Sequence, residues 1–146
     1  MDASIPLLPE VEAIGQTLEV AVRNVLENAI KYSFDERFIE VKGRMVSGNY
    51  VELDIDDFGI GIPEEEQTKV FDKRYRGKSR GRRTVKQGEG LGAWQAWEIL
   101  HAHGGYIYCF STSRRGDRKP TPGDVNGFKT TFTLGLPVEQ KYRKEE

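Results

Sequence analysis

Residues 23–33 read Arg23-Asn24-Val25-Leu26-Glu27-Asn28-Ala29-Ile30-Lys31-Tyr32-Ser33, and the fold is predicted from this stretch outward. Apolar residues recur at helical spacing between Leu18 and Ala29, which predicts an amphipathic helix over about residues 17–32. Asn24, Asn28 and Lys31 fall at i, i+4 and i+7, so they share one face of that helix, turned away from the apolar stripe. Asparagine is a poor residue for a helix interior. This polar face therefore calls for an explanation, which the neighbouring motifs have to supply.

The segments on either side of this helix predict a sheet. A short edge strand is expected within residues 4–13, and residues 38–45 and 50–56 alternate as a β-hairpin around Ser47-Gly48-Asn49. Pro63, followed by three glutamates, opens a helix that should run to about Lys73. A further helix is expected over residues 91–102, and residues 106–112 and 128–136 should form paired strands. This order predicts an α+β fold: a two-layer sandwich with about three helices on one face of a mixed, mostly antiparallel sheet.

Length and composition place the chain among single globular domains. Its 146 residues can bury a core without metals or disulfides, and its formal net charge is only −1. We expect one domain with a core at about residues 8–137 and a frayed polar tail at 138–146. No apolar stretch is long enough to cross a bilayer, and residues 1–9 lack a basic leader, so a cytoplasmic location is expected. A longer parent protein could still be membrane-anchored. Cys109 is expected to be a buried, inert thiol.

A first glycine motif, Asp57-Phe58-Gly59-Ile60-Gly61, follows the second strand of the predicted hairpin. Glycines two apart allow positive φ and let a flat ligand approach the backbone. A carboxylate at Asp57 would accept a hydrogen bond from the exocyclic amine of adenine and repel the carbonyl oxygen of guanine. The same run imitates a calcium loop. We reject that interpretation because Phe58 replaces a ligand, Pro63 interrupts the loop, and a strand precedes it.

A second glycine motif, Gly88-Glu89-Gly90-Leu91-Gly92, opens the helix expected over residues 91–102. Free backbone N–H groups at a helix start bind phosphate. The eight Lys and Arg residues between 73 and 86 would close over a phosphate chain as a flexible lid, about residues 73–88. Gly77-Lys78-Ser79 imitates a P-loop, but Asp72 occupies the position of the required glycine. A carboxamide oxygen on the first helix suits Mg²⁺, and Lys31 supplies a charge for a phosphate.

These motifs, in this order, resemble the catalytic domain of bacterial histidine kinases, in the superfamily shared with gyrase, the heat-shock chaperone and MutL. The resemblance covers about residues 8–137 and implies binding of ATP and Mg²⁺. Residues 70–76 resemble the phenylalanine box of that family. The implied roles are Mg²⁺ ligation for Asn28, the phosphate site for Asn24, Arg76, Gly88, Gly90, Leu91 and Gly92, nucleotide contacts for Lys31, Tyr32 and Phe71, and the adenine pocket for Asp57, Gly59, Gly61, Ile62 and Thr130.

The resemblance also implies a reaction. Hydrolytic members of the superfamily carry a glutamate at the position of Asn24, and an amide cannot accept a proton from water. We therefore expect transfer of the γ-phosphoryl group to a histidine on a separate dimerisation and phosphoacceptor domain, with Asn24, Lys31 and Arg76 as the catalytic set. A response regulator would follow in two-component signal transduction. Neither His101 nor His103 lies in an acceptor motif, so the chain should not phosphorylate itself. It is expected to be monomeric, without nucleic-acid or membrane contacts.

The chain departs from the family pattern at three places. Arg74 replaces a second aromatic residue, Lys129 replaces a glycine in the last strand, and Ala93-Trp94-Gln95-Ala96-Trp97 replaces smaller aliphatic residues. The two tryptophans are expected to be core or half-buried packing residues. Three alternatives stay open: a hydrolytic ATPase of the same superfamily, a non-catalytic ATP-dependent interaction switch, and nucleic-acid binding through residues 73–86, for which the overall charge is unfavourable.

Overall fold

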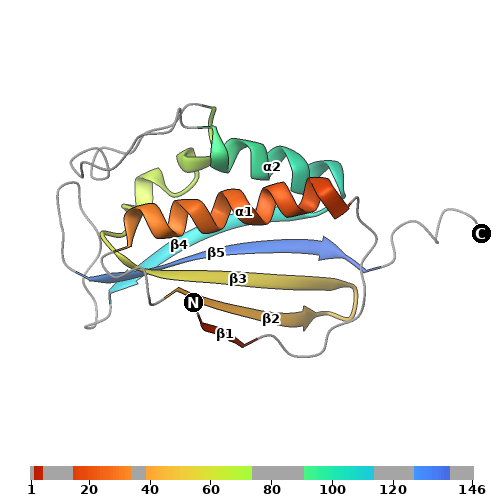
Figure 1. Cartoon of the computed structure of the whole chain (residues 1–146), viewed down its shortest axis with the longest axis horizontal. Helices are drawn as coiled ribbons and strands as arrows, with labels where there is room; N and C mark the ends of the chain where they lie inside the picture. Colours follow the sequence, from red (N-terminus) through yellow and green to blue (C-terminus); the bar gives the residue numbers. More distant parts are fainter. Residues whose placement is uncertain (1, 5–14, 34–38, 74–90, 114–126, 139–146) are drawn as a thin grey trace, which may run out of the picture.

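The computed structural model describes residues 2–4, 15–33, 39–73, 91–113 and 127–138. Five strands form one sheet in the order β1-β2-β3-β5-β4, and helices α1 and α2 lie on one face of it (Figure 1). β1 pairs with β2 in parallel, and every other pair is antiparallel. The predicted α+β sandwich is confirmed. The elements are β1 Asp2–Ser4, α1 Gly15–Tyr32, β2 Glu40–Val46, β3 Tyr50–Gly59, η1 Glu64–Glu66, η2 Lys69–Phe71, α2 Gly92–Ala102, β4 Tyr106–Ser113 and β5 Phe128–Pro137.

The helix predicted after Pro63 is instead two 3₁₀ turns, η1 and η2. Their backbone bonds span three residues, as from Gln67 N to Glu64 O, rather than four. The Gln67 side chain donates back to Ile62 O over 2.9 Å, which closes the segment on itself. The bend brings Val70 into the core and sets the Phe71 ring edge-on to that of Phe132, at 6.0 Å. Tertiary packing therefore outweighs the local helix signal.

Both α-helices match their predicted ranges, and α2 ends as its glycines predict. Gly104 takes a φ of 80°, and its N–H bonds to His101 O over 3.0 Å. Gly105 N–H bonds to Leu100 O over 2.8 Å, so the turn has the paired bonds of a Schellman motif. Among the described residues, no helix is long and apolar enough to cross a membrane.

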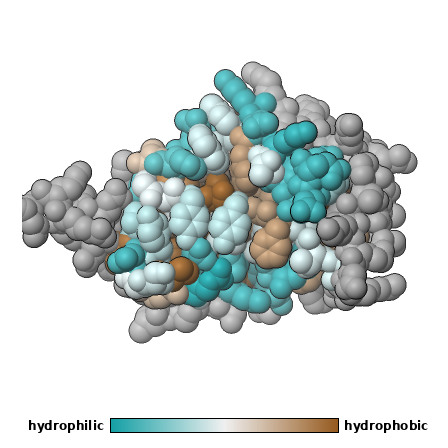
Figure 2. Space-filling model, turned by 180° about the vertical axis from the view of Figure 1, so that it is seen from behind, coloured by the Kyte–Doolittle hydropathy of each residue, from teal (hydrophilic) through white to brown (hydrophobic). Residues whose placement is uncertain are grey.

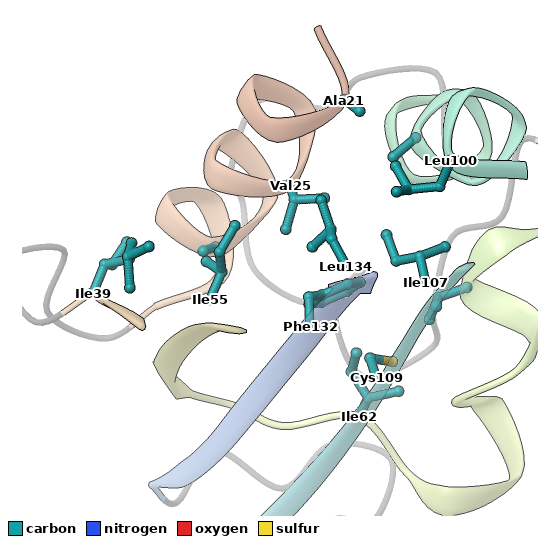
Figure 3. Packing of buried hydrophobic residues seen from close by; sticks show 14 of the residues in the cluster. Ala21, Val25, Ile39, Ile55, Ile62, Leu100, Ile107, Cys109, Phe132 and Leu134 are labelled. Atoms are coloured by element: carbon teal, nitrogen blue, oxygen red, sulfur yellow. The ribbon is translucent and has the colours of Figure 1, made fainter. Parts of the chain in front are cut away.

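The core lies between the two helices and the sheet (Figure 3). α1 contributes Ala21, Val25 and Ala29 at intervals of four residues, which is the apolar stripe expected from the sequence. Ile55 and Phe132 face them from paired positions on β3 and β5. Cys109 is buried in the same cluster, as predicted. The helix-facing side of β3 is thus set by Ile55, and it includes Asp57 two residues later.

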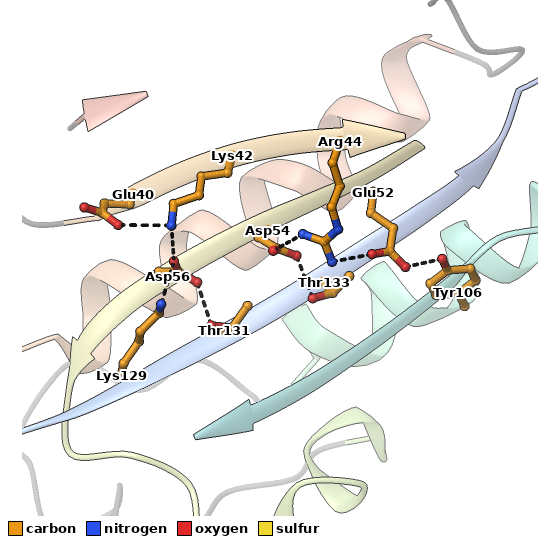
Figure 4. Close-up of polar contacts among 10 residues, drawn as sticks. All are labelled: Glu40, Lys42, Arg44, Glu52, Asp54, Asp56, Tyr106, Lys129, Thr131 and Thr133. Carbon is orange, nitrogen blue, oxygen red and sulfur yellow. Dashed lines mark hydrogen bonds and ion pairs between the residues drawn. The ribbon is translucent and has the colours of Figure 1, made fainter. Parts of the chain in front are cut away.

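The other face of the sheet carries a polar network instead of helices (Figure 4). Asp56 accepts from Thr131 Oγ1 over 2.6 Å and lies 3.8 Å from Lys42 Nζ and 3.7 Å from Lys129 Nζ. On the same side, Arg44 pairs with Glu52 and Asp54. These pairs neutralise the acidic side chains of β3 that would otherwise repel one another along the strand.

Aromatic rings continue this open face across the edge strand β4. Tyr50 lies 5.5 Å from Tyr106, and Tyr106 stacks on Tyr108 at 6.0 Å. In the view from behind, pale aromatic rings lie side by side among polar side chains (Figure 2). Tyr106 also donates its hydroxyl hydrogen to Glu52. Burial, followed by the bond to Glu52, raises the pKa of Tyr106 well above its ordinary value.

Candidate functional site

The polar face of α1 is turned toward the start of α2. Asn24 Nδ2 donates to Gln95 Oε1 over 3.0 Å. A Cβ built on Gly92, the first residue of α2, would lie 3.8 Å from Asn24 Cβ, so the backbone of this helix start is next to the Asn24 side chain. Asn28 is one turn further along the same face of α1. Asn24 and the start of α2 therefore lie side by side, and the phosphate and Mg²⁺ roles of this face stay predictions.

The C-terminal end of α1 adjoins the C-terminal end of β3. Ser33 Oγ donates to Phe58 O over 3.1 Å, and Ser33 forms an isolated β-bridge with Gly59. Lys31 lies in the last turn of α1, just before this junction. The helix face that carries Asn24, Asn28 and Lys31 thus leads to the strand end that carries Asp57.

Asp57 is buried on the helix-facing side of β3, with 2% of its surface exposed. Its partner across the ladder is Thr130 of β5, which is fully buried. Thr130 shares a hydrogen bond of 2.6 Å with Ser111, and Ser111 Oγ accepts from Ile62 N over 2.9 Å. These bonds join two predicted pocket residues, Thr130 and Ile62, through Ser111, which the sequence analysis did not single out, and Asp57 lies beside Thr130 in the ladder.

The two glycines of the first motif have different roles. Gly61 has a φ of 76°, a conformation that side chains rarely adopt, as the motif predicted. Gly59 instead pairs with Phe128 as the last residue of β3. β3 is therefore longer than predicted and includes Asp57, because β5 pairs with it along its whole length. Burial of the strand end holds Asp57 in place.

Several predicted site residues lie outside the described part of the chain. They are Arg76, Gly88 and Gly90, together with the rest of the lid except Lys73, and the same holds for the side chain of Tyr32. Leu91 is described and caps the N-terminus of α2. Of the second glycine motif the structure describes only Leu91 and Gly92, and its phosphate-binding role stays a prediction.

A groove of about 640 Å³ lies on another side of α2. Of the predicted nucleotide residues only Phe71 lines it, together with Trp94, Trp97 and the edge strand. Trp97 packs against the core and lies 4.0 Å from the His101 ring, and Lys73 Nζ is 4.8 Å from the Trp94 ring. Both tryptophans are half-buried packing residues, as predicted.

The donors at the site fit a metal that is held mainly by its substrate. Among the residues that the structure describes, no three His, Cys, Asp or Glu side chains come together to bind a metal ion. The α1 face instead offers neutral carboxamides beside a helix N-terminus. Mg²⁺ keeps several waters and binds through few protein oxygens plus substrate phosphates. Asn28 and Asn24 therefore fit Mg²⁺ only when it arrives with a phosphate chain.

Lys129, which departs from the family pattern, lies away from this site. It precedes Thr130, so its side chain is on the opposite face of the sheet, where it pairs with Asp56. The substitution therefore extends the polar network of the open face and leaves the pocket around Thr130 unchanged.

Gln95 is, with Ser111, a residue of the candidate site that the sequence analysis did not assign to it. Gln95 follows Gly92 by three residues, a spacing that places both on one side of α2. That spacing was the available signal, but only the packing of α2 beside α1 shows that this side meets Asn24.

The fold and the site together define an ATP-binding domain of the α+β sandwich type. The chain belongs to the family of histidine kinase-, DNA gyrase B- and HSP90-like ATPases, whose model matches residues 14–140. Within this family its similarities are to sensor histidine kinases, so it is a histidine kinase-type ATPase domain.

Two curated relatives and two solved structures illustrate the similarity. The chain is 38% identical over 109 residues to the adaptive-response sensory kinase SasA of Gloeothece citriformis (75% of this chain, 27% of the relative). It is 41% identical over 92 residues to the signal transduction histidine-protein kinase ArlS of Staphylococcus aureus (62% and 20%). The mycobacterial sensor histidine kinase MprB superimposes with a TM-score of 0.74 at 27% identity (93% of this chain, 82% of that chain). Full-length ShkA in complex with AMPPNP gives 0.66 at 19% identity (93% and 25%), which shows the fold alone. The chain thus spans about a quarter of the length of these curated relatives.

Proposed function

We propose that this chain binds Mg·ATP and transfers the γ-phosphoryl group to a histidine on a separate dimerisation and phosphoacceptor domain, in two-component signal transduction. The observation that carries the proposal is the pairing of Asn24 on α1 with Gly92 and Gln95 at the start of α2. The similarity to proteins named as sensor histidine kinases supports it. A response regulator would receive the phosphoryl group afterwards.

Each element of the site has a distinct task in this proposal. Asn28 would hold Mg²⁺ through its carboxamide oxygen, and the bound metal would offset the charge of the phosphates. Lys31 would add a positive charge, and the backbone at Leu91 and Gly92 would orient the phosphate chain. Asp57 would accept a hydrogen bond from the adenine amine. The domain would then catalyse mainly by positioning the γ-phosphate for in-line attack.

The residue at position 24 favours transfer over hydrolysis. Asn24 is an amide whose nitrogen already donates to Gln95. The nitrogen lone pair of an amide is delocalised into the carbonyl group, so Asn24 cannot act as a general base toward water. An incoming neutral imidazole differs from water, because one of its ring nitrogens carries no proton and can attack through its lone pair without a base on this domain.

The acceptor histidine is proposed to lie outside this chain. The chain has two histidines, and both end α2. His101 Nδ1 lies 3.1 Å from Trp97 O, and His103 Nδ1 lies 2.8 Å from Ile99 O, so the helix end engages one nitrogen of each ring. Incubation of the isolated chain with labelled ATP should leave the chain unlabelled.

Calorimetry with ATP and GTP, each with and without Mg²⁺, tests the binding step. We expect ATP binding to depend on Mg²⁺ and on Asn28, and Asp57→Asn to reduce the preference for ATP by about 10- to 100-fold. Glu27→Gln is the matched control, because Glu27 is exposed on α1 next to Asn28 and should leave affinity unchanged. Absence of nucleotide binding by the unmodified chain would refute the proposal.

Addition of a histidine phosphoacceptor domain then separates the possible outcomes. Transfer of label to the acceptor that is lost in Asn28→Ala is the expected result. Steady release of phosphate without an acceptor would indicate a hydrolytic ATPase instead. Binding without either reaction would indicate a nucleotide-dependent interaction switch.

A further inference from the structure

Gln95 meets Asn24 across the boundary between α1 and α2. Asn24 Nδ2 donates to Gln95 Oε1 over 3.0 Å, a normal hydrogen-bond length. Gln95 is exposed and Asn24 is half-buried, so the bond lies at the opening between the helices rather than in the core. Its position next to Gly92 places it beside the helix start that would hold the phosphates.

The direction of this bond decides which atom Asn24 presents to the nucleotide. A carboxamide is planar, with its oxygen and nitrogen on opposite sides. Because Nδ2 points to Gln95 on α2, Oδ1 is turned away from Gln95. An oxygen in that position accepts from a metal-bound water or binds Mg²⁺ itself, and it repels phosphate oxygens. The reversed amide would donate to phosphate.

We infer that Gln95 is a positioning residue that holds Asn24 with Oδ1 toward the nucleotide, so that Asn24 acts on the Mg²⁺ side of the triphosphate and not on the phosphate oxygens. This inference rests on the proposed function and specifies it. Gln95 lies in residues 93–97, where the chain departs from the smaller aliphatic residues typical of its family.

The alternative geometry is the flipped pair, in which Asn24 Oδ1 accepts from Gln95 Nε2. The oxygen and nitrogen of an amide are similar in size, so the flipped pair would fill the same space. The two geometries make opposite predictions about the metal. With Oδ1 toward the nucleotide, loss of Asn24 weakens binding only when Mg²⁺ is present. With Nδ2 toward the nucleotide, it weakens binding of metal-free ATP equally.

A double-mutant cycle on the full chain tests the inference. Its members are Asn24→Ala, Gln95→Leu and the double variant, and Glu98→Leu is the control because Glu98 is another exposed residue of α2. ATP affinity is measured by calorimetry in Mg²⁺ and in excess EDTA. We expect Gln95→Leu to lower affinity about two- to tenfold in Mg²⁺, to have no effect in EDTA, and to have no further effect once Asn24 is alanine.

Two results would overturn the inference. Equal losses with and without Mg²⁺ would show that Asn24 faces the phosphates through Nδ2. An undiminished effect of Gln95→Leu in the Asn24→Ala background would show that Gln95 does not act through Asn24. Thermal unfolding of each variant identifies any loss that comes from the fold itself.

A readout without nucleotide keeps this inference separate from the proposed function. In the free chain, the side-chain NH₂ resonances of Asn24 in a ¹H–¹⁵N spectrum should move in Gln95→Leu and stay in place in Glu98→Leu. Unchanged Asn24 resonances in Gln95→Leu would contradict the bond. If the unmodified chain bound no ATP at all, the proposed function would fail while this spectrum still tested the Asn24–Gln95 pair.

Discussion

Replacement of Gly92 by alanine should have opposite effects on the stability of the fold and on nucleotide affinity. The new Cβ would lie 3.8 Å from Asn24 Cβ and 4.0 Å from Asn24 Cγ, which are ordinary van der Waals distances. The fold therefore accommodates the methyl group without strain. Alanine also loses less conformational entropy than glycine in a helix, which stabilises the folded state by up to about 1 kcal/mol. For a chain of this size that corresponds to a rise in the melting temperature of up to about 4 °C.

The same methyl group would fill space that a phosphate chain needs. It would project from the start of α2 toward Asn24, next to the backbone N–H groups proposed to bind phosphate. Loss of one charge-assisted hydrogen bond costs about 1.5–3 kcal/mol, so we expect the Kd for Mg·ATP to rise about 10- to 100-fold. Thermal unfolding and calorimetry on one preparation measure both effects.

Gly105→Ala is the matched control, because its Cβ would lie only 1.9 Å from Gly135 O and 3.4 Å from Leu100 O. Backbone atoms cannot give way cheaply, so we expect a loss of at least about 3 kcal/mol of folding free energy. A Gly92→Ala chain that melts earlier than the unmodified one would refute the geometry at the start of α2. One that melts later but binds ATP normally would refute the phosphate role of Gly92.

Two further predictions concern the open face. Tyr106→Phe should cost about 1–3 kcal/mol, because buried Glu52 loses a donor. Because the pKa of Tyr106 is raised in the folded chain, its contribution to stability is present below pH 10.0 and is lost as the pH rises through the raised pKa. The free energy of unfolding in urea should therefore decline less at alkaline pH for Tyr106→Phe than for the unmodified chain. An equal decline would contradict this. Lys129→Gly should lower stability by about 0.5–1 kcal/mol but leave ATP affinity unchanged by calorimetry, since Lys42 still pairs with Asp56; changed affinity would contradict this.

Local periodicity was sufficient to predict α1 and its polar face. A helix repeat of 3.6 residues fixes which residues share a face, so the positions of Asn24 and Asn28 follow from spacing alone. The same holds for the end of α2, because Gly104 is free to take the left-handed conformation that the turn requires. Wherever one residue or one turn decides the geometry, the sequence is informative.

Features that depend on pairing between distant segments could not be predicted in the same way. β3 extends to Gly59 because β5, which begins at Phe128, pairs with it to the end. The turns around Glu66 depend on Gln67 reaching Ile62 and on the packing of Phe71 against Phe132 of β5. The contact of Gln95 with Asn24 depends on how closely two helices pack. None of these contacts can be predicted from a window of neighbouring residues, because each joins segments that are distant in sequence or depends on tertiary packing.

Asp56 and Asp57 show how a strand places neighbouring residues in different environments. Adjacent residues of a strand point to opposite faces, so these two carboxylates have separate environments although they are neighbours in sequence. Asp56 is enclosed by Thr131, Lys42 and Lys129 on the open face. Asp57 is buried on the helix side, across the ladder from Thr130. A substitution in β5 can therefore change the partners of one acid without affecting the other. The sequence alone shows Lys129 as a departure next to Thr130 of the predicted adenine pocket, whereas the structure pairs Lys129 with Asp56 on the open face.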